Sequence, residues 1–269
     1  MSRLDRALVD RNMLGSRSRA AREIAAGRVD VNGRTVTKAS HEVAETDALT
    51  VTEPDPWVAR SAHKLLGALE AFDLAPADLT GLSALDAGAS TGGFTQVLLH
   101  WGLAEVWAVD VGHDQLAPTL REHPRVHMRE GLNLRDLAAS DVPANDLVVA
   151  DVSFISLRLL IDPLLQATTG DGQLLLMVKP QFELARSALD KHGVVTTAAN
   201  RRRALESVIA AVAEHGARVI DIAASPLPGP SGNREYFLRV RPGRTPLASD
   251  RLNEADIPAR LDEMMRGES

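Results

Sequence analysis

A short run of glycines and small polar residues follows Asp86, at the end of an apolar stretch and before a helix-like segment. Glycine lets a backbone approach a ligand closely, and open α/β sheets bind ligands at the carboxyl ends of their strands. The glycine spacing differs from the dinucleotide fingerprint. The loop therefore predicts a ligand site, with a tight turn as the alternative. Its remaining candidate residues are Gly88, Ser90, Thr91, Gly92, Gly93 and Phe94.

A second acidic residue, Asp110, ends the next apolar stretch, about 20 positions after the glycine loop. A carboxylate at this place accepts hydrogen bonds from both hydroxyls of a ribose in nucleotide-binding sheets. The pair of features indicates a ligand that contains adenosine. A cap on the turn before Gly112 is the structural alternative for Asp110.

Two residues of opposite charge, Asp151 and Lys179, end the fourth and fifth strand-like stretches. The carboxyl ends of parallel strands meet at one edge of a sheet, so both side chains should reach the same crevice. Opposite charges in such a crevice change each other's affinity for protons, which is typical of functional sites. Solvated strand ends are the alternative.

Several motifs in a fixed order resemble the TlyA (hemolysin A) family of ribosomal RNA methyltransferases. They span nearly the whole chain: Arg60–Leu65, Asp86–Thr95, Asp151–Leu157, Val178–Glu183 and Ser225–Asn233. Near the N-terminus, three further segments look like the RNA-binding module of a small-subunit ribosomal protein, and the remainder is similar to FtsJ-like ribose methyltransferases. These segments are Arg3–Asp5, Ser16–Ala20 and Val29–Gly33.

The resemblance implies S-adenosylmethionine as cofactor and a catalytic tetrad of Lys64, Asp151, Lys179 and Glu235. It also implies cofactor contacts from the loop between Asp86 and Phe94, from Asp110 at the ribose, from Asn133 near the adenine and from Asp151. Without the resemblance, Asn133 is equally a loop residue or a helix cap. The expected acceptor is a ribose 2′-hydroxyl of ribosomal RNA, in a cytidine.

A ribose hydroxyl is a weak nucleophile, whereas a sulfonium methyl group needs mainly an in-line approach and the removal of one proton. We hypothesise that Lys179 takes that proton, helped by desolvation and by the positive charge of Lys64. Asp151 favours the protonated lysine, so a role for Asp151 in orienting the lysine or the cofactor stays open. Glu235 would position Lys64 or the ribose.

Short β-like and helical stretches alternate through most of the chain, which predicts a doubly wound, Rossmann-like α/β methyltransferase sheet. It has seven expected strands, one of them antiparallel because the last two are joined by a Pro- and Gly-rich loop. The expected strands are 82–86, 106–110, 126–128, 147–151, 174–178, 218–223 and 236–240. An apolar stripe over 62–72 predicts a helix capped by Ser61, with Lys64 on its polar face.

The N-terminal segment predicts two short helices and a β-hairpin turning at Asn32-Gly33, a small α+β RNA-binding domain. We expect this domain over 1–52, a linker over 53–60, the methyltransferase domain over 61–241, and a polar C-terminal tail over 242–269. Within the tail, the stretch from Ile257 to Met265 predicts a short helix.

Positive charge is concentrated at the N-terminus. The net charge is -6, but residues 1–40 hold nine Arg or Lys and four Asp or Glu, a net of +5, so the rest carries -6 minus 5, or -11. Clustered arginines neutralise phosphates and position RNA more than they read its sequence, although a solvated charged face is the alternative. The predicted RNA contacts are Arg3, Arg6, Arg17, Arg19, Arg22 and Lys38.

The chain contains no cysteine, and its eight histidines lack ligand-like spacing, so we expect no disulfide, thiol nucleophile or metal site. No apolar run has the roughly 20 residues of a membrane span, so a cytoplasmic protein is expected. The expected partner is ribosomal RNA within ribosomal subunits, with a monomer favoured. Alternatives are a non-catalytic RNA-binding or ribosome-assembly protein, a small-molecule methyltransferase, and, least favoured, a cytolysin.

Overall fold

A computed structural model of the chain describes residues 2–52, 56–248 and 250–267. The chain divides into two compact units, Met1–Pro56 and Trp57–Ser269. The division falls within the expected linker 53–60, of which residues 53–55 lie outside the described residues. Each unit has hydrophobic clusters of its own.

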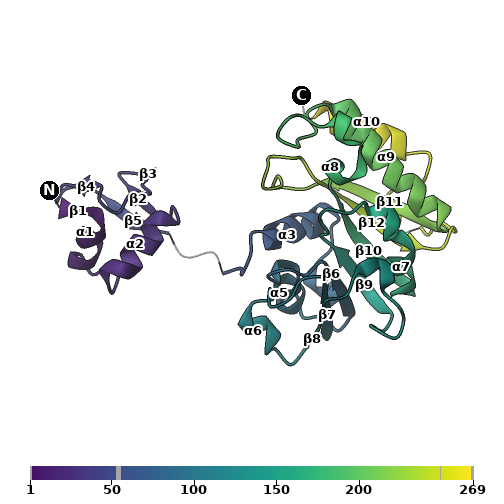
Figure 1. Cartoon of the computed structure of the whole chain (residues 1–269), viewed down its shortest axis with the longest axis horizontal. Helices are drawn as coiled ribbons and strands as arrows, with labels where there is room; N and C mark the ends of the chain where they lie inside the picture. The colour runs from purple at the N-terminus through teal and green to yellow at the C-terminus, as the bar shows by residue number, and fades with distance from the viewer. Residues whose placement is uncertain (1, 53–55, 249, 268–269) are drawn as a thin grey trace. The chain divides into compact units, whose positions relative to one another are not determined.

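The N-terminal unit consists of two helices and short antiparallel strands (Figure 1). Asn32 and Gly33 have φ values of 53° and 75°, the left-handed backbone that a two-residue hairpin turn requires. The predicted order of helix, helix and hairpin is confirmed. The elements are β1 (Ser2–Arg3), α1 (Leu4–Asp10), α2 (Arg17–Ala25), β2 (Val29–Val31), β3 (Arg34–Thr35), β4 (Glu42–Val43) and β5 (Leu49–Val51).

Asp5 is a buried carboxylate beneath the surface of this unit, with an exposed fraction of 4%. Arg3 Nε donates to its Oδ1 at 3.0 Å, and Arg17 Nη2 donates to its Oδ2 at 2.9 Å. The hydrogen bond from Arg3, followed by the contact with Arg17, lowers the pKa of Asp5 to about 2. Asp5 therefore joins β1, α1 and the first turn of α2 through charge.

The larger unit is built on a seven-stranded sheet with the order β11-β12-β10-β9-β6-β7-β8. Strand β12 is antiparallel to both of its neighbours, and the other pairings are parallel, which confirms the predicted doubly wound sheet with one antiparallel strand. The strands are β6 (Ser83–Ala87), β7 (Glu105–Asp110), β8 (Val126–Glu130), β9 (Asn145–Ala150), β10 (Thr168–Val178), β11 (Ala217–Ala224) and β12 (Tyr236–Pro242).

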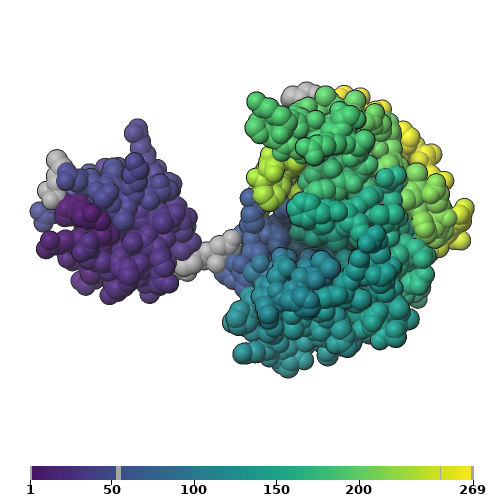
Figure 2. All heavy atoms as spheres, in the orientation of Figure 1, coloured from purple at the N-terminus to yellow at the C-terminus, as the bar shows by residue number. Residues whose placement is uncertain are grey.

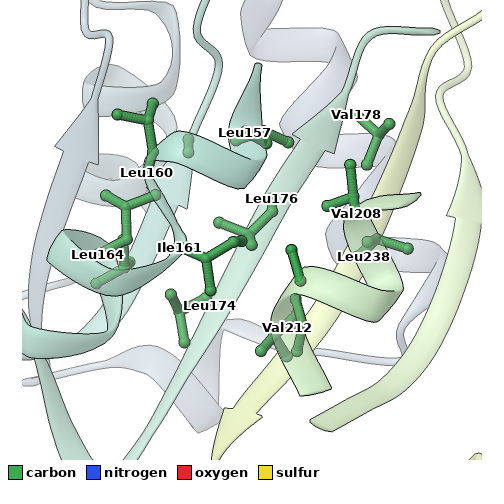
Figure 3. Close-up of a cluster of buried hydrophobic side chains, with 14 of the residues drawn as sticks. Leu157, Leu160, Ile161, Leu164, Leu174, Leu176, Val178, Val208, Val212 and Leu238 are labelled. Carbon is green, nitrogen blue, oxygen red and sulfur yellow. The ribbon is translucent and has the colours of Figure 1, made fainter. Parts of the chain in front are cut away.

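Helices cover both faces of the sheet, because alternate residues of its central strands are apolar on both sides (Figure 1). In β10, Leu174, Leu176 and Val178 face the side of α7, α9 and α10, where Figure 3 shows them packed with leucines and valines. Leu175 and Met177 face the side of α3 and α5. The helices are α3 (Ser61–Ala71), α4 (Pro76–Leu79), α5 (Gly93–His100), α6 (Pro118–Arg121), α7 (Ile161–Gln166), α8 (Pro180–Glu183), α9 (Ala198–Glu214) and α10 (Ile257–Arg266), with 3-10 turns η1 (Leu134–Asp136), η2 (Leu157–Leu159) and η3 (Arg186–Ala188).

Two local expectations differ from the structure. Strand β10 begins at Thr168, well before the expected Leu174, because its Gly-rich start still pairs with β9 across a register shift. Ser61 is the first residue of α3 and not its cap, since Arg60 holds the cap position without a side-chain hydrogen bond.

The segment after Pro242, expected as a polar tail, contributes α10 to the core of the larger unit. Ile257, Leu261 and Met265 lie one turn apart on α10 and are buried against the sheet cluster. Arg260 also donates to the carbonyl oxygen of Ile222 in β11, at 3.3 and 3.2 Å. Among the described residues, no helix combines the length and apolar character of a membrane span.

We predict that Asp5→Asn weakens the N-terminal unit at neutral pH by about 1 kcal/mol, because half-exposed arginines give only part of the free energy that the lowered pKa implies. The stabilisation is present above pH 3.8 and is lost as the pH falls towards about 2, so the difference should shrink in acid. Amide exchange of residues 2–52 in the full chain measures it. An equal difference at pH 7 and pH 3 would contradict the assignment.

Candidate active site

The glycine loop lies at the carboxyl end of β6 and leads into α5. Gly88 and Gly92 have φ values of +88° and +98°, a conformation that side chains rarely adopt. A Cβ at Gly88 would lie 2.8 Å from the carbonyl oxygen of Asp151, and one at Gly93 would collide with the hydroxyl of Ser61. The loop therefore packs directly onto the end of β9 and the start of α3.

Asp110, at the end of β7, is fastened to this loop. Its Oδ2 accepts a hydrogen bond from the backbone N–H of Ser90 at 2.8 Å, and its Oδ1 accepts one from Gly112 at 2.7 Å. The turn-capping role that the sequence left as an alternative is thus present. Each carboxylate oxygen still has a second lone pair for a ligand hydroxyl.

A cavity of about 490 Å³ opens at the carboxyl ends of the central strands. Its lining brings together residues from the loops after β6, β7, β8 and β9, as expected for an open α/β sheet. Asn133 lines it and also caps η1, because its Oδ1 accepts from the N–H of Arg135 at 3.1 Å. The predicted cofactor residues among its lining are Gly88, Ser90, Asp110, Asn133 and Asp151.

The other predicted cofactor residues support the loop from outside this cavity. Thr91 does not line it, and its carbonyl oxygen instead accepts from the N–H of Ala117 at 3.1 Å. Gly92 and Gly93 are buried in contact with Leu120 and Ser61. Phe94 stacks on Phe237 with ring centroids 6.2 Å apart.

Asp86 lies beneath the loop and is fully buried. Its Oδ2 accepts a hydrogen bond from the hydroxyl of Thr95 at 2.6 Å, while its Oδ1 has no hydrogen-bond partner among the described residues. Burial raises the pKa of Asp86 to about 7, and the Thr95 hydrogen bond opposes that rise. Asp86 therefore supports the loop through Thr95 and does not contact a ligand directly, since it lines neither this cavity nor the smaller one described next.

A second cavity, of about 170 Å³, adjoins the first. The two share Gly88, Ser90, Asp151 and Ser153, and the second extends to Lys179. Lys179 Nζ lies 2.6 Å from Asp151 Oδ1 and donates to Ser153 Oγ at 2.8 Å. The expected meeting of Asp151 and Lys179 at one crevice is therefore observed.

Lys64 and Glu235 form a separate, more deeply buried pair, in which Lys64 Nζ donates to Glu235 Oε2 at 2.6 Å. The exposed fractions of their side chains are 6% and 1%. The pattern predicted Lys64 on the polar face of α3, and the structure shows that this position is not solvated, because it packs on the sheet with Met177 Sδ 4.0 Å from the amine. Neither partner lines the second cavity.

The loop between β11 and β12 holds Glu235 against α3. A Cβ at Gly229 would lie 2.5 Å from Glu235 Oε1, and a Cβ at Gly67 of α3 would lie 2.5 Å from Pro226. Arg60 donates to the carbonyl oxygen of Pro228. Figure 2 shows the surface of this loop beside that of α3.

Ser153 and Phe154 are cavity residues that the sequence reasoning did not select. Phe154 is 91% exposed, has a φ of 65°, and contacts Phe182 with ring centroids 5.2 Å apart. Their only signal was the Asp151–Leu157 motif, which contains both. A bulky residue with left-handed backbone and an exposed ring is typical of a functional surface.

Comparison with known proteins identifies the larger unit. Residues 57–241 match the FtsJ-like methyltransferase family. The chain belongs to this family. Residues 2–49 match the S4 domain.

A relative from Mycobacterium tuberculosis, named 16S/23S rRNA (cytidine-2'-O)-methyltransferase TlyA, is 46% identical over 89% of this chain and 90% of its own length. The protein called Hemolysin A of Brachyspira hyodysenteriae is 34% identical over 87% of this chain and 98% of its own length. A solved structure from Streptococcus thermophilus that carries the hemolysin name has a TM-score of 0.73 and 30% identity, covering 99% of this chain and 97% of that one. The FtsJ-like match covers every residue that lines the two cavities.

The predicted RNA contacts of the S4 domain are exposed, and they differ in their partners. Arg3 and Arg17 pair with Asp5, and Arg6 lies 3.4 Å from Asp10. Within residues 2–52, the side chains of the remaining three form no ion pair. These three are Arg19, Arg22 and Lys38.

Within the described ranges, no group of three or more His, Cys, Asp or Glu side chains has an arrangement that holds a metal ion. The four predicted catalytic residues form two ion pairs, each of a lysine with a carboxylate.

We predict that Asp86→Asn stabilises the FtsJ-like domain relative to the native chain increasingly as the pH rises from about 4 to about 7. Over that window the native carboxylate must ionise in a buried site, because its pKa is raised to about 7, whereas the unfolded chain ionises near 3.8. All three tryptophans lie in the larger unit, so denaturation followed by tryptophan fluorescence measures it. A stability difference that is independent of pH would refute this prediction.

Proposed function

We propose that this protein transfers a methyl group from S-adenosylmethionine to the 2′-hydroxyl of a cytidine ribose in ribosomal RNA. The observation that carries the proposal is the pair of adjoining cavities. The larger is lined by Asp110 and Asn133, which suit a nucleoside, and the smaller reaches Lys179. The name of the M. tuberculosis relative supplies the base, the ribose position and the RNA class.

The larger cavity has the features that an adenosine cofactor needs. Asp110 offers carboxylate lone pairs to ribose hydroxyls. The absence of a side chain at Gly88 lets the loop pack on the backbone of Asp151, so that both residues line the cavity. Asn133 lies where the adenine would bind, and Asp151 lines both cavities. When bound, the cofactor supplies an electrophilic methyl group on a sulfonium.

We assign proton removal to Lys179, since its amine is the basic group that reaches the smaller cavity. Asp151 holds that amine at 2.6 Å and so fixes its position at the wall that the two cavities share. Lys64 and Glu235 neutralise each other, and their contact holds α3 against the start of β12, over the site. The tetrad thus acts as one reacting lysine, an aspartate that places it, and a buried ion pair that supports α3.

RNA recognition is assigned to two surfaces. The S4 domain offers exposed cations to phosphates, which gives affinity that depends on salt. At the mouth of the cofactor cavity, the exposed ring of Phe154 offers a face on which an unstacked base can rest. All tetrad residues come from one chain, so a monomer is sufficient for the reaction. A ribosomal substrate implies that the protein acts in the cytoplasm.

We expect Lys179→Ala to lower the turnover number by roughly 100- to 10,000-fold, because general-base catalysis contributes that much, with little change in the dissociation constant of the cofactor. Transfer of labelled methyl to purified small subunits, large subunits, whole ribosomes and protein-free RNA measures the first quantity, and calorimetry measures the second. Mapping of the label identifies the ribose.

Lys191→Ala, at an exposed lysine beyond η3, is the matched control and should keep full activity. Label that persists in Lys179→Ala would remove Lys179 from the role of proton acceptor. Absence of transfer by the unmodified protein to any of the four substrates, despite cofactor binding, would overturn the proposed function.

For the S4 domain, we expect replacement of Arg19, Arg22 and Lys38 by glutamine to weaken RNA binding and to flatten its dependence on salt. The slope of log K against log salt should fall by about 1 for each phosphate that the variant no longer neutralises. Filter binding over a salt series measures the slope, with Arg203→Gln on α9 as a control for the loss of an exposed cation outside the S4 domain. An unchanged slope in the triple variant would show that these side chains do not contact phosphates.

A further inference from the structure

Two segments that leave neighbouring strands are fastened together beside the smaller cavity. Residues 151–157 follow β9, and residues 179–183, Lys179 and α8, follow β10. The strands are parallel neighbours, so both segments start at the same edge of the sheet. Lys179 contacts Asp151 and Ser153, and Phe182 contacts Phe154.

Glu183 makes the last contact between the segments, and it does so from a buried position. Its side chain is 1% exposed. Its Oε2 accepts from the hydroxyl of Ser156 at 2.5 Å, and its Oε1 accepts from the N–H of Leu157 at 2.8 Å. Arg158 Nε lies 3.7 Å from the same carboxylate. A buried carboxylate requires such donors, and all of these come from the segment that begins at Asp151 and from the residue after it.

The segment that Glu183 holds contains a strained residue. Phe154 has a φ of 65°, and bulky residues keep left-handed backbone only where surrounding contacts impose it. Ser153 directly precedes it, so the position of the Ser153 hydroxyl depends on the same contacts. Glu183 is therefore placed to determine where that hydroxyl lies.

Ser153 controls the direction of the reacting amine. A neutral lysine amine has two N–H bonds and one lone pair in a tetrahedral arrangement. Ser153 Oγ, at 2.8 Å, accepts one N–H of Lys179 Nζ and so fixes one donor direction. Asp151 Oδ1 lies 2.6 Å from the same nitrogen as an ion pair without hydrogen-bond geometry. The lone pair is then left to point elsewhere, and Lys179 lines the smaller cavity.

We propose that Ser153, held in place by Glu183, is a positioning residue that directs the lone pair of Lys179 into the smaller cavity. This inference rests on the proposed function for the identity of the reacting lysine. It adds two residues that act through Lys179, of which Ser153 lines both cavities and Glu183 lines neither.

The first test compares Ser153→Ala with Ser153→Thr in the full-length protein, on the ribosomal substrate that the unmodified protein methylates. Loss of the hydroxyl should lower kcat by roughly 10- to 100-fold, the usual consequence of a misplaced reacting group, with little change in KM for RNA. Threonine keeps the hydroxyl and should restore most of kcat. A rise in KM alone, with kcat unchanged, would overturn the proposal.

The second test asks whether Glu183 acts through Ser153. Glu183→Ala should lower kcat, whereas Glu183→Gln retains an acceptor for Leu157 and should lower it far less. If one residue acts through the other, the double variant Ser153→Ala/Glu183→Ala should be no slower than Ser153→Ala. If the two reductions in kcat multiply in the double variant, the residues have independent roles, and Glu183 does not act through Ser153.

A matched control exists at the opposite end of β9. Asp146 Oδ2 accepts from both the N–H and the hydroxyl of Ser83, at 3.0 and 2.9 Å, so this carboxylate too joins two segments through a backbone N–H and a serine hydroxyl. Asp146→Ala should therefore cost comparable stability and leave kcat unchanged.

A readout without activity separates this inference from the proposed function. Amide exchange of residues 151–157 should accelerate in Glu183→Ala and stay unchanged in Asp146→Ala. Unaltered exchange in Glu183→Ala would disprove the proposal that Glu183 holds residues 151–157 in place, even if methyl transfer were observed. Accelerated exchange in a protein that methylates no RNA would support that role of Glu183 and reject the proposed function.

Discussion

The ion pair between Asp151 and Lys179 is the interaction on which the arrangement of the site depends. Lys179 is 8% exposed, and a cation buried to that extent is stable only beside a compensating charge. The pair lies at the carboxyl ends of β9 and β10, so the register between those two strands decides whether the charges meet. The wall that the two cavities share is built on this contact.

The second ion pair, between Lys64 and Glu235, joins a helix to the sheet. Lys64 comes from α3 and Glu235 from the residue directly before β12, so their contact spans most of the larger unit in sequence. Glycines at Gly67 and Gly229 make room for it, because a side chain at either position would meet Pro226 or Glu235. Close packing and charge neutralisation together hold α3 over the sheet, and α3 in turn closes against the glycine loop at Gly93.

The cations that suit RNA docking are concentrated in the first 40 residues, apart from the two lysines of the larger unit that suit the chemistry. Phosphates attract a basic surface over distances of about 10 Å at ordinary salt. Within the N-terminal unit, residues 1–40 supply such a surface, with nine Arg or Lys against four Asp or Glu, although nine Asp or Glu balance the nine cations over the whole of Met1–Pro56. The larger unit is acidic overall and keeps its two functional lysines in ion pairs. Docking and chemistry therefore draw on different cations, and the paired lysines are not diverted to phosphate binding.

The sequence by itself determined the features that arise from neighbours along the chain. Apolar periodicity predicted the strands and most helices, Asn32-Gly33 predicted the hairpin turn, and the glycine loop predicted a ligand site after β6. These follow from backbone conformation and from burial of one face of an element, which a few consecutive residues decide.

Only the tertiary structure decided which side chains meet. Lys64 looks like a solvated residue of α3 until the sheet and Glu235 are placed beside it. Ser153 and Glu183 are ordinary polar residues until β9 and β10 align and bring them to Lys179 and to the 151–157 segment. The sequence pattern places α10 in a polar tail, and only the tertiary structure shows that its three apolar residues are buried in the core. Each of these contacts joins residues far apart in the chain, and the local sequence pattern does not determine the strand register that brings them together.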